Sequence, residues 1–568
     1  MNLTSSFRRK IPHGKEYANR LARELKLIEK NNFANVFLQV REILDLVPDF
    51  RHVTRGSAGC SLVGYLMGIH NLDPVQNRFA LSRFMHELRI DLPDIDLDFS
   101  YNQRDIVLEK VKEKYPGRVA RISNHVKYRE NSAIRQALRE MGQRKFVPKH
   151  FELDELAGEN SNVVLQRATE LCGSFKNYSL HCGGIVIFPD KIPDDLKLDE
   201  NQIKLNKDEI EERGYFKIDL LCNRAIAQLN DLSDRPLEDY PENDDLTSKV
   251  FQSADTWGLT FGESPAQRRL NNDLKPKSRS EITLSLAMIR PLPSADGRRV
   301  KILEQFHQKR SHDGHLIYDD DGIYFIQKLL NCSEAEAELY RKAFGKKKQE
   351  KISEFLEKIK YHPNRKEIAQ ELSYFGLYSF CHAHAMSYGQ LVWALAYEKA
   401  RQPQKFWLSA LNHAQTMYRP WVHVQESKKA GLKFMGFGKG PWKLIGEKLY
   451  PKHEESIGDG WSQFYRRGYW ISDRFMPGMF EKWKNNFVEF RGLIATGRHH
   501  RVNQRDITFV TIGTNTGKYL DLIFEGSKNY DKYDIVEGSG LFQNNSVQVS
   551  NFQFEKAQKC QQLNLFSN

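Results

Sequence analysis

Three aspartates alternate with apolar residues in the stretch LPDIDLDFS, residues 92–100. Strict alternation predicts a β-strand, because successive side chains leave a strand on opposite faces. Asp94, Asp96 and Asp98 would then share one face, opposite a buried apolar face. Neighbouring carboxylates on that face would lie about 6.6 Å apart, close enough to bind shared cations. Without a cation the row would repel itself, so the stretch predicts a positively charged ligand.

Three interpretations of this strand are open from its residues alone. A calcium loop opens with the same D-x-D-x-D pattern, but it requires Gly and Glu where this chain has Phe99 and Asp105. An edge strand with a solvated acidic face would need no metal. The third interpretation is a two-metal phosphoryl-transfer site, in which oxygen ligands hold two Mg²⁺ ions about 3.5–4 Å apart.

The surrounding sequence favours the third interpretation. The turn RGSAGCSL places Gly56 and Ser57 at the start of a predicted helix, where backbone N–H groups could approach a phosphate. Downstream, KIDLL sets Asp219 alone between apolar residues on another predicted strand. Arg83 and Arg89 precede the acidic strand. They would either bind the triphosphate of a nucleotide or only neutralise the carboxylates. This order of motifs resembles that of the polymerase-β-like nucleotidyltransferases.

Composition excludes several classes of protein. Lys and Arg outnumber Asp and Glu by 85 to 73, which gives a net charge of +12 and suits a polyanionic partner. The seven cysteines include no C-x-x-C pair, which argues against a zinc ribbon or a disulfide framework and fits a reducing cytoplasm. No apolar run of transmembrane length occurs, so we expect neither secretion nor a membrane span.

Periodicity predicts alternating helical and β-rich parts across the 568 residues, enough for several domains. Short β runs at regular spacing over 487–555 predict a small barrel such as an OB-fold. Its probable basic loop is GRHHRVNQRD. Such a domain either binds single-stranded template or serves only as a packing module. Helices are predicted over 14–48, 126–178 and 225–425, and strands are predicted from Gly183 and over 215–222.

Many short motifs follow one another in an order that resembles the bacterial DNA polymerase III α-subunit family, the C-family polymerases. Besides RGSAGCSLVGYLMGIHNLDP and LPDIDLDFS, they are HCGGIVIFPD, YFKIDLLC, DTWGLTFGES, LAMIRPLP, FGKKK and SFCHAHAMSY. The resemblance runs from about residue 15 to 425, and more loosely to 556.

The resemblance implies an α+β multidomain fold: a polymerase-β-like nucleotidyltransferase palm with helical thumb and fingers, plus a C-terminal OB-like β-barrel. The implied domains are a palm (1–125, with N-terminal helices, and 179–224), a thumb (126–178), fingers (225–425), a small helical region with a degenerate helix-hairpin-helix (426–486), the OB-like domain (487–556) and a tail (557–568).

The resemblance also implies roles for individual residues. Asp94, Asp96 and Asp219 would be the catalytic metal ligands for two Mg²⁺ ions, with Mn²⁺ as an alternative, and Asp98 would support them from behind. Nucleotide binding would fall to Gly56, Ser57, Arg83, Arg89, Arg290 and His384, and DNA binding to Lys127, Arg129, Arg135, Lys346 and Lys347.

Several family features are missing from the sequence. No PHP domain precedes the palm, and no exonuclease signature appears, so proofreading in cis is not expected. A motif that usually reads Lys-Ser-His is His382-Ala383-His384 here, which puts nucleotide affinity in doubt. The thumb lysine expected near Asn131 is absent, and GFGKGPWKLIG is a weak helix-hairpin-helix candidate.

The C-terminal tail contains QLNLF, which resembles the short peptide that binds the bacterial sliding clamp. Leu565 and Phe566 would fill an apolar pocket, while Gln562 and Leu563 complete the contact. A tethered clamp would raise the effective concentration of an enzyme with a reduced grip on DNA.

The sequence therefore predicts a template-directed DNA polymerase that acts on primer-template DNA and dNTPs without proofreading in cis. Recruitment to the sliding clamp in the cytoplasm, at the nucleoid, for bypass or gap-filling synthesis is the expected setting. The alternatives are an untemplated nucleotidyltransferase and a catalytically inactive DNA- or clamp-binding factor.

Overall fold

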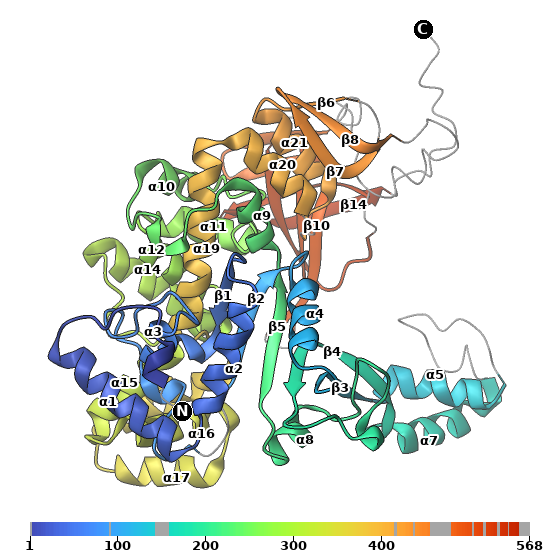
Figure 1. The fold of residues 1–568 in the computed structure, drawn as a ribbon. Coiled ribbons are helices and arrows are strands. Elements are labelled where there is room, and N and C mark those ends of the chain that lie inside the picture. The colour runs from blue at the N-terminus through green and yellow to red at the C-terminus, as the bar shows by residue number, and fades with distance from the viewer. Residues whose placement is uncertain are drawn as a thin grey trace. The chain divides into compact units, whose positions relative to one another are not determined.

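The computed structural model describes residues 3–89, 93–142, 158–413, 417–435, 438–454, 479–502, 505–514, 518–530, 534–543 and 545–555. The chain divides into two compact units (Figure 1), each described separately below. The first unit comprises residues 1–70 and 84–222, and the second comprises residues 71–83 and 223–568. Both contain helices and strands, which confirms the mixed α and β multidomain class.

A five-stranded sheet with the order β1-β2-β5-β4-β3 forms the centre of the first unit. The acidic strand β2 therefore lies between β1 and β5, although about 120 residues separate β2 from β5 in the sequence. The strands are β1 (His52–Arg55), β2 (Ile95–Ser100), β3 (Val119–Lys127), β4 (Phe175–Ile187) and β5 (Lys217–Asn223).

The alternation in β2 produces the buried apolar face that the sequence predicted. Ile95, Leu97 and Phe99 are at most 1% exposed. The opposite face is not the solvated surface of an edge strand, because β2 has neighbours on both sides and Asp98 is only 2% exposed. The edge-strand interpretation is therefore wrong for this strand.

The N-terminal helices α1 (Lys15–Lys30) and α2 (Ala34–Asp45) lie where periodicity predicted a helical segment. One charged residue of α1 departs from the amphipathic pattern, because Glu24 is completely buried. Its carboxylate accepts hydrogen bonds from the backbone N–H groups of Leu62 (2.7 Å) and Val63 (3.0 Å), at the start of α3 (Leu62–Leu66). Glu24 thus supplies the negative charge that a helix N-terminus attracts.

We expect Glu24→Ala to lower the free energy of unfolding of the first unit by about 3 kcal/mol, since two buried N–H groups would lose their partner. Glu24→Gln keeps one acceptor oxygen and should cost less. Thermal denaturation followed by circular dichroism measures both. Equal stability of wild type and Glu24→Ala would contradict this role.

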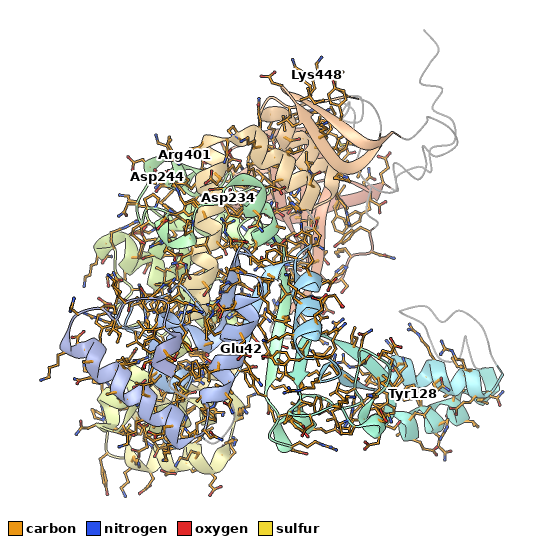
Figure 2. The ribbon with its side chains drawn as sticks, in the orientation of Figure 1. Glu42, Tyr128, Asp234, Asp244, Arg401 and Lys448 are labelled. Carbon is orange, nitrogen blue, oxygen red and sulfur yellow. The ribbon has the colours of Figure 1, made fainter. Side chains whose placement is uncertain are left out.

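Two helices project from the strand pair β3–β4 in the predicted thumb segment, α5 (Glu130–Glu140) and α7 (Ser161–Leu171). They pack through Ala133, Ala137, Leu138, Val164 and Ala168. At their base the Tyr128 backbone bonds to Ser174 and Gly173 (Figure 2). The prediction of a strand starting at Gly183 was wrong by several residues, because β4 pairs with β3 from Phe175 onward.

The second unit is largely helical between residues 224 and 429, as predicted. Its long helix α19 (His382–Arg401) is buried over most of its length. The ion pair between Asp244, which caps α10, and Arg401, which ends α19, joins these helices (2.6 Å; Figure 2). The other helices are α9 (Arg224–Leu232), α10 (Asp245–Gln252), α11 (Pro265–Leu274), α12 (Arg279–Met288), α13 (Pro291–Ser294), α14 (Arg298–Lys309), α15 (Asp319–Leu330), α16 (Glu334–Lys346), α17 (Gln349–Lys358), α18 (Arg365–Ser373), α20 (Pro403–His413) and α21 (Pro420–Lys429).

The segment GFGKGPWKLIG was expected to contain a degenerate helix-hairpin-helix, and this expectation was wrong for the residues that the structure describes. β7 (Gly438–Ile445) and β8 (Lys448–Glu454) form an antiparallel hairpin, joined in a small sheet by β6 (Lys433–Phe434). Gly446 makes the turn with φ of 62°, a conformation that glycine adopts without strain. The alternation of Trp442, Leu444 and polar residues is a strand pattern.

Six strands near the C-terminus form one sheet in the order β11-β12-β14-β13-β10-β9, and β10 also pairs with β11. The strands are β9 (Phe480–Lys484), β10 (Phe487–Val502), β11 (Arg505–Gly513), β12 (Tyr519–Glu525), β13 (Ile535–Gln543) and β14 (Ser546–Glu555). The pair β12–β14 is parallel, and the other pairs are antiparallel. Apart from β9, each strand thus pairs with at least two others around a core that includes Val488, Phe490 and Val536.

Among the residues that the structure describes, no helix is both long and apolar enough to cross a membrane.

Candidate active site

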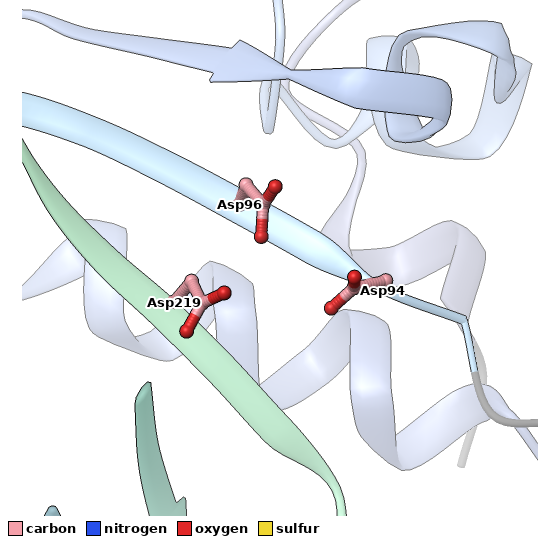
Figure 3. A group of neighbouring side chains, drawn as sticks. All are labelled: Asp94, Asp96 and Asp219. Carbon is pink, nitrogen blue, oxygen red and sulfur yellow. The ribbon is translucent and has the colours of Figure 1, made fainter. Parts of the chain in front are cut away.

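The three predicted metal ligands lie together in the first unit (Figure 3). Asp96 is in β2, Asp94 immediately precedes β2, and Asp219 is in the neighbouring strand β5. One carboxylate oxygen from each lies within 4.8 Å of the others. The side chains of Asp94, Asp96 and Asp219 are 45%, 20% and 12% exposed, so the group is open on the side of Asp94.

The carboxylates strongly perturb one another. Burial and the nearby charges of Asp94 and Asp219 raise the pKa of Asp96 to about 7, although Arg55 (3.4 Å from Asp96 Oδ2) acts in the opposite direction. Among the described residues, Asp96 Oδ1 and Asp219 Oδ1 are buried without a hydrogen-bond partner. Buried carboxylate oxygens that lack donors are suited to a divalent cation, and an all-oxygen set fits Mg²⁺ or Mn²⁺.

A buried lysine that the sequence reasoning missed lies between two of these acids. Lys217 Nζ is 2.7 Å from Asp219 Oδ2 and 3.2 Å from Asp94 Oδ1, and its side chain is 5% exposed. Burial alone would lower the pKa of Lys217, but Asp94 and Asp219 outweigh it and raise that pKa. The available signal was the spacing in KID, since residues two apart on a strand share a face.

Arg55 and His181 also lie next to the acids. Arg55, at the end of β1, contacts Asp96 and also lies 3.7 Å from Asp98 Oδ1. His181 Nδ1 is 3.7 Å from Asp219 Oδ1 and accepts the N–H of Gly184 (2.8 Å). Burial lowers the pKa of His181, so the imidazole is neutral at physiological pH and its Nδ1 serves as the acceptor.

The predicted phosphate turn lies beside the acids, but it does not begin an α-helix. A Cβ atom added at Gly56 would be 3.9 Å from Asp96 Oδ2, and φ of +75° favours glycine there. Gly56 and Ser57 belong to a 3₁₀ turn, and the helix begins after Ser61. Its first N–H groups are bound by Glu24, so the expectation of a helix N-terminus at Gly56 was wrong.

Each of the two predicted triphosphate arginines bonds to a group outside the acidic triad. Arg83 belongs to the second unit, where its guanidinium binds Asp319 (2.8 Å) and Glu338 (3.2 Å). Burial would lower the pKa of Arg83, but these carboxylates outweigh it and raise that pKa. In the first unit Arg89 Nη1 donates to the Phe84 carbonyl (2.6 Å).

Two predicted nucleotide-binding residues of the second unit meet on one aromatic ring. The Arg290 guanidinium lies 3.7 Å from the centroid of Phe380, and the His384 ring stacks on Phe380 at 4.4 Å. Burial lowers the pKa of Arg290. Tyr378, which lies 5.7 Å from the Arg290 guanidinium, is 58% exposed, so this cluster borders solvent.

All but one of the predicted DNA-binding residues lie at or next to the end of a helix or strand. In the first unit, Lys127 ends β3, Arg129 precedes α5 and Arg135 lies within α5. In the second unit, Lys346 ends α16 and Lys347 follows it. All except Arg135 are exposed. The predicted clamp-binding residues Gln562, Leu563, Leu565 and Phe566 lie outside the described residues.

The fold and the site define a multidomain protein of mixed α and β structure whose first unit contains a group of three acids suited to a divalent cation. Residues 2–222 match the family model of the bacterial DNA polymerase III alpha NTPase domain, and residues 221–367 match that of the bacterial DNA polymerase III alpha subunit finger domain. The first match ends where the first unit ends. These two consecutive domains together span more than half of the 568 residues, so the chain belongs to the bacterial DNA polymerase III α-subunit family.

Curated relatives include both replicative and error-prone enzymes. The chain is 27% identical to DNA polymerase III subunit alpha of Aquifex aeolicus, over 74% of this chain and 44% of that protein. It is 27% identical to the same subunit of Bacillus subtilis, over 69% and 40%, respectively. It is 26% identical to an error-prone DNA polymerase of Anaeromyxobacter dehalogenans, over 75% and 44%. The chain thus spans less than half the length of these relatives.

Proposed function

We propose that this chain is a template-directed DNA polymerase that adds dNMPs to the 3′ end of a primer. The observation that supports the proposal is the convergence of Asp94, Asp96 and Asp219 in a protein of the DNA polymerase III α-subunit family. The palm comprises residues 1–125 and 179–224, the thumb 126–178 and the fingers 225–425.

In this proposal Asp94, Asp96 and Asp219 hold the divalent cations. Bound as a pair, such cations stabilise both the attacking and the leaving oxygen of an in-line phosphoryl transfer. Lys217 holds Asp94 and Asp219 together, and Arg55 limits the repulsion at Asp96. Gly56 keeps the space beside Asp96 free of a side chain, since an added Cβ would lie 3.9 Å from Asp96 Oδ2.

The test is primer extension by the full chain with Mg²⁺ and dNTPs on templates of different sequence. Incorporation that follows the template supports the proposal. Tails of the same sequence on every template, or on single strands, would instead indicate an untemplated nucleotidyltransferase. No incorporation by wild type beyond that of an Asp94→Ala variant would indicate an inactive DNA- or clamp-binding factor.

We further propose that synthesis serves bypass or gap filling in the cytoplasm, at the nucleoid. A relative named error-prone DNA polymerase supports this setting, although replicative subunits match equally well. Extension past an abasic site in the template, compared with extension on an undamaged template, tests it. A complete stop at the lesion with efficient extension elsewhere would contradict the bypass role.

The strand pairing in the C-terminal sheet supports the proposal that these strands form an OB-like barrel. In this proposal the barrel binds single-stranded template. Besides the order β11-β12-β14-β13-β10, strand β10 also pairs with β11, which supports a ring of the five strands β10–β14, the number typical of this fold. The β10–β11 hairpin carries Arg498, His499, His500, Arg501 and Arg505, which would follow a phosphate backbone.

The QLNLF tail supports recruitment to the bacterial sliding clamp. We expect deletion of Gln562–Asn568 to abolish capture of the clamp in a pull-down, while primer extension without the clamp stays unchanged. The matched control is Gln561→Ala, one residue before the motif. Undiminished capture by the deletion variant would refute the assignment.

A further inference from the structure

A hollow of about 250 Å³ in the second unit lies apart from every residue assigned above. Helix α11 supplies Arg268, Arg269 and Asn272 on one side. The C-terminal sheet supplies the other side, including Trp483 of β9, Phe542 of β13 and Tyr519 of β12. The size is that of a small binding site and suits one ring-sized group.

Aromatic rings and cations face the same space. Trp483 is 46% exposed although it contacts the edge of Phe542 (5.1 Å between ring centroids). A large ring left this exposed beside cations is suited to stacking with a planar ligand.

The arginines make this hollow a site for an anion. The Arg268 guanidinium lies over the Trp257 ring, with its Cζ 3.5 Å from the ring centroid, and its Nε donates to the Ala254 carbonyl (3.0 Å). These contacts fix its orientation. Arg269 is 3.5 Å from Asp521, and Asp273 also interacts with its charge, so the positive charge offered to a ligand comes mainly from Arg268. Oriented guanidinium groups bind phosphate with two parallel hydrogen bonds.

The hollow is separate from the basic β10–β11 hairpin. Tyr519 pairs with Gly513, whereas the other end of β12, Glu525, pairs with Ile507 near the hairpin. The two places therefore lie at opposite ends of β12, about 20 Å apart at 3.3 Å per residue.

We propose that this hollow binds a nucleoside phosphate, with the base against Trp483 and the phosphate beside Arg268 and Arg269. The ligand is either a free nucleotide or one unpaired nucleotide of a single strand, because both present the same base and phosphate. Binding here uses neither the acidic triad nor a divalent cation. The proposal therefore stands or falls independently of the polymerase activity.

The test measures binding to the full chain in EDTA, which removes divalent cations from the acidic triad. The probes are a labelled short oligothymidylate, the same strand with abasic sites, and unlabelled thymidine 5′-monophosphate as a competitor. The variants are Trp483→Ala, which removes the ring, and Asn272→Asp, which adds a negative charge to the hollow at almost constant shape. Tyr361→Ala, at a tyrosine that is 89% exposed elsewhere in this unit, is the control.

We expect Trp483→Ala to weaken binding at least about fivefold, the effect of losing one base–aromatic stack. Asn272→Asp should weaken it as well, and Tyr361→Ala should not. Competition by the mononucleotide identifies a free nucleotide as the source, and binding of the oligomer alone identifies a strand. The proposal is overturned if both pocket variants bind as wild type does, or if Trp483→Ala weakens binding to the abasic strand as much as binding to the intact strand.

Discussion

Replacing Asp96 by asparagine is expected to reduce primer extension on the order of a thousandfold, equivalent to about 4 kcal/mol of transition-state stabilisation. Asp96 lies close to both other acids, and its Oδ1 accepts no hydrogen bond among the described residues. A neutral amide keeps the shape of the side chain but loses the charge that a shared divalent cation requires.

The same substitution should have the opposite effect on stability when metal is removed. The pKa of Asp96 is about 7 in the folded protein against an ordinary 3.8, so the folded state holds this proton more tightly than the unfolded state does. Stability of the wild type is therefore lost as the pH rises from about 3.8 to 7. The substituted asparagine carries no charge, so Asp96→Asn should melt at a higher temperature than wild type above pH 7, and the gap should close toward pH 4.

Thermal denaturation in EDTA across this pH range, together with primer extension in Mg²⁺, measures both effects. Asp105→Asn is the matched control, because Asp105 lies in the first turn of α4 (Arg104–Lys114) in the same unit and its side chain is 78% exposed. It should change neither measurement. An Asp96→Asn variant that extends primers at the wild-type rate would refute the catalytic assignment.

Replacing Lys217 by methionine is expected to destabilise the first unit by about 3 kcal/mol at neutral pH and to lower primer extension on the order of a hundredfold. Methionine has nearly the same length but no charge. Without the ammonium group, Asp94 and Asp219 repel each other across a mostly buried site and lose the contact that orients them.

Added Mg²⁺ separates this role from a general packing role. A cation bound by the three acids replaces part of the lost positive charge, so Mg²⁺ should raise the melting temperature of Lys217→Met more than that of wild type. Lys207→Met is the control. Lys207 Nζ is 3.9 Å from Asp94 Oδ2, but its side chain is 48% exposed, so its loss should change stability little. Equal responses of Lys217→Met and Lys207→Met would contradict the proposed role.

Local sequence patterns were sufficient for the elements. The alternation in IDLDF predicted β2, and the spacing of apolar residues predicted α1, α2 and the helices between 225 and 425. Such patterns are local, because each side chain's direction depends on the strand or helix period alone. The prediction for GFGKGPWKLIG was wrong, because a helix-hairpin-helix was expected there from the family resemblance. The alternation of apolar and polar residues in this segment indicated strands instead.

Partnerships between distant residues were harder to predict. Glu24 looked like one of many charges on an amphipathic helix, and Gly56 like the start of the helix that follows. In the fold, the buried Glu24 carboxylate binds the N–H groups at the start of α3, so this helix N-terminus is already occupied by the chain itself. Arg83 is similarly paired, with Asp319 and Glu338 more than 230 residues away.

By itself, the sequence determined which residues could do chemistry: acids at alternate positions of one strand and a single acid on another, in a motif order that identified the family. Only the tertiary structure decided which charges meet. Placing β5 beside β2 brought Asp219 to Asp94 and Asp96 and buried Lys217 between two of them. Strand order is set by packing across the whole sheet, and the effect of each charge depends on the partners and burial that this order creates.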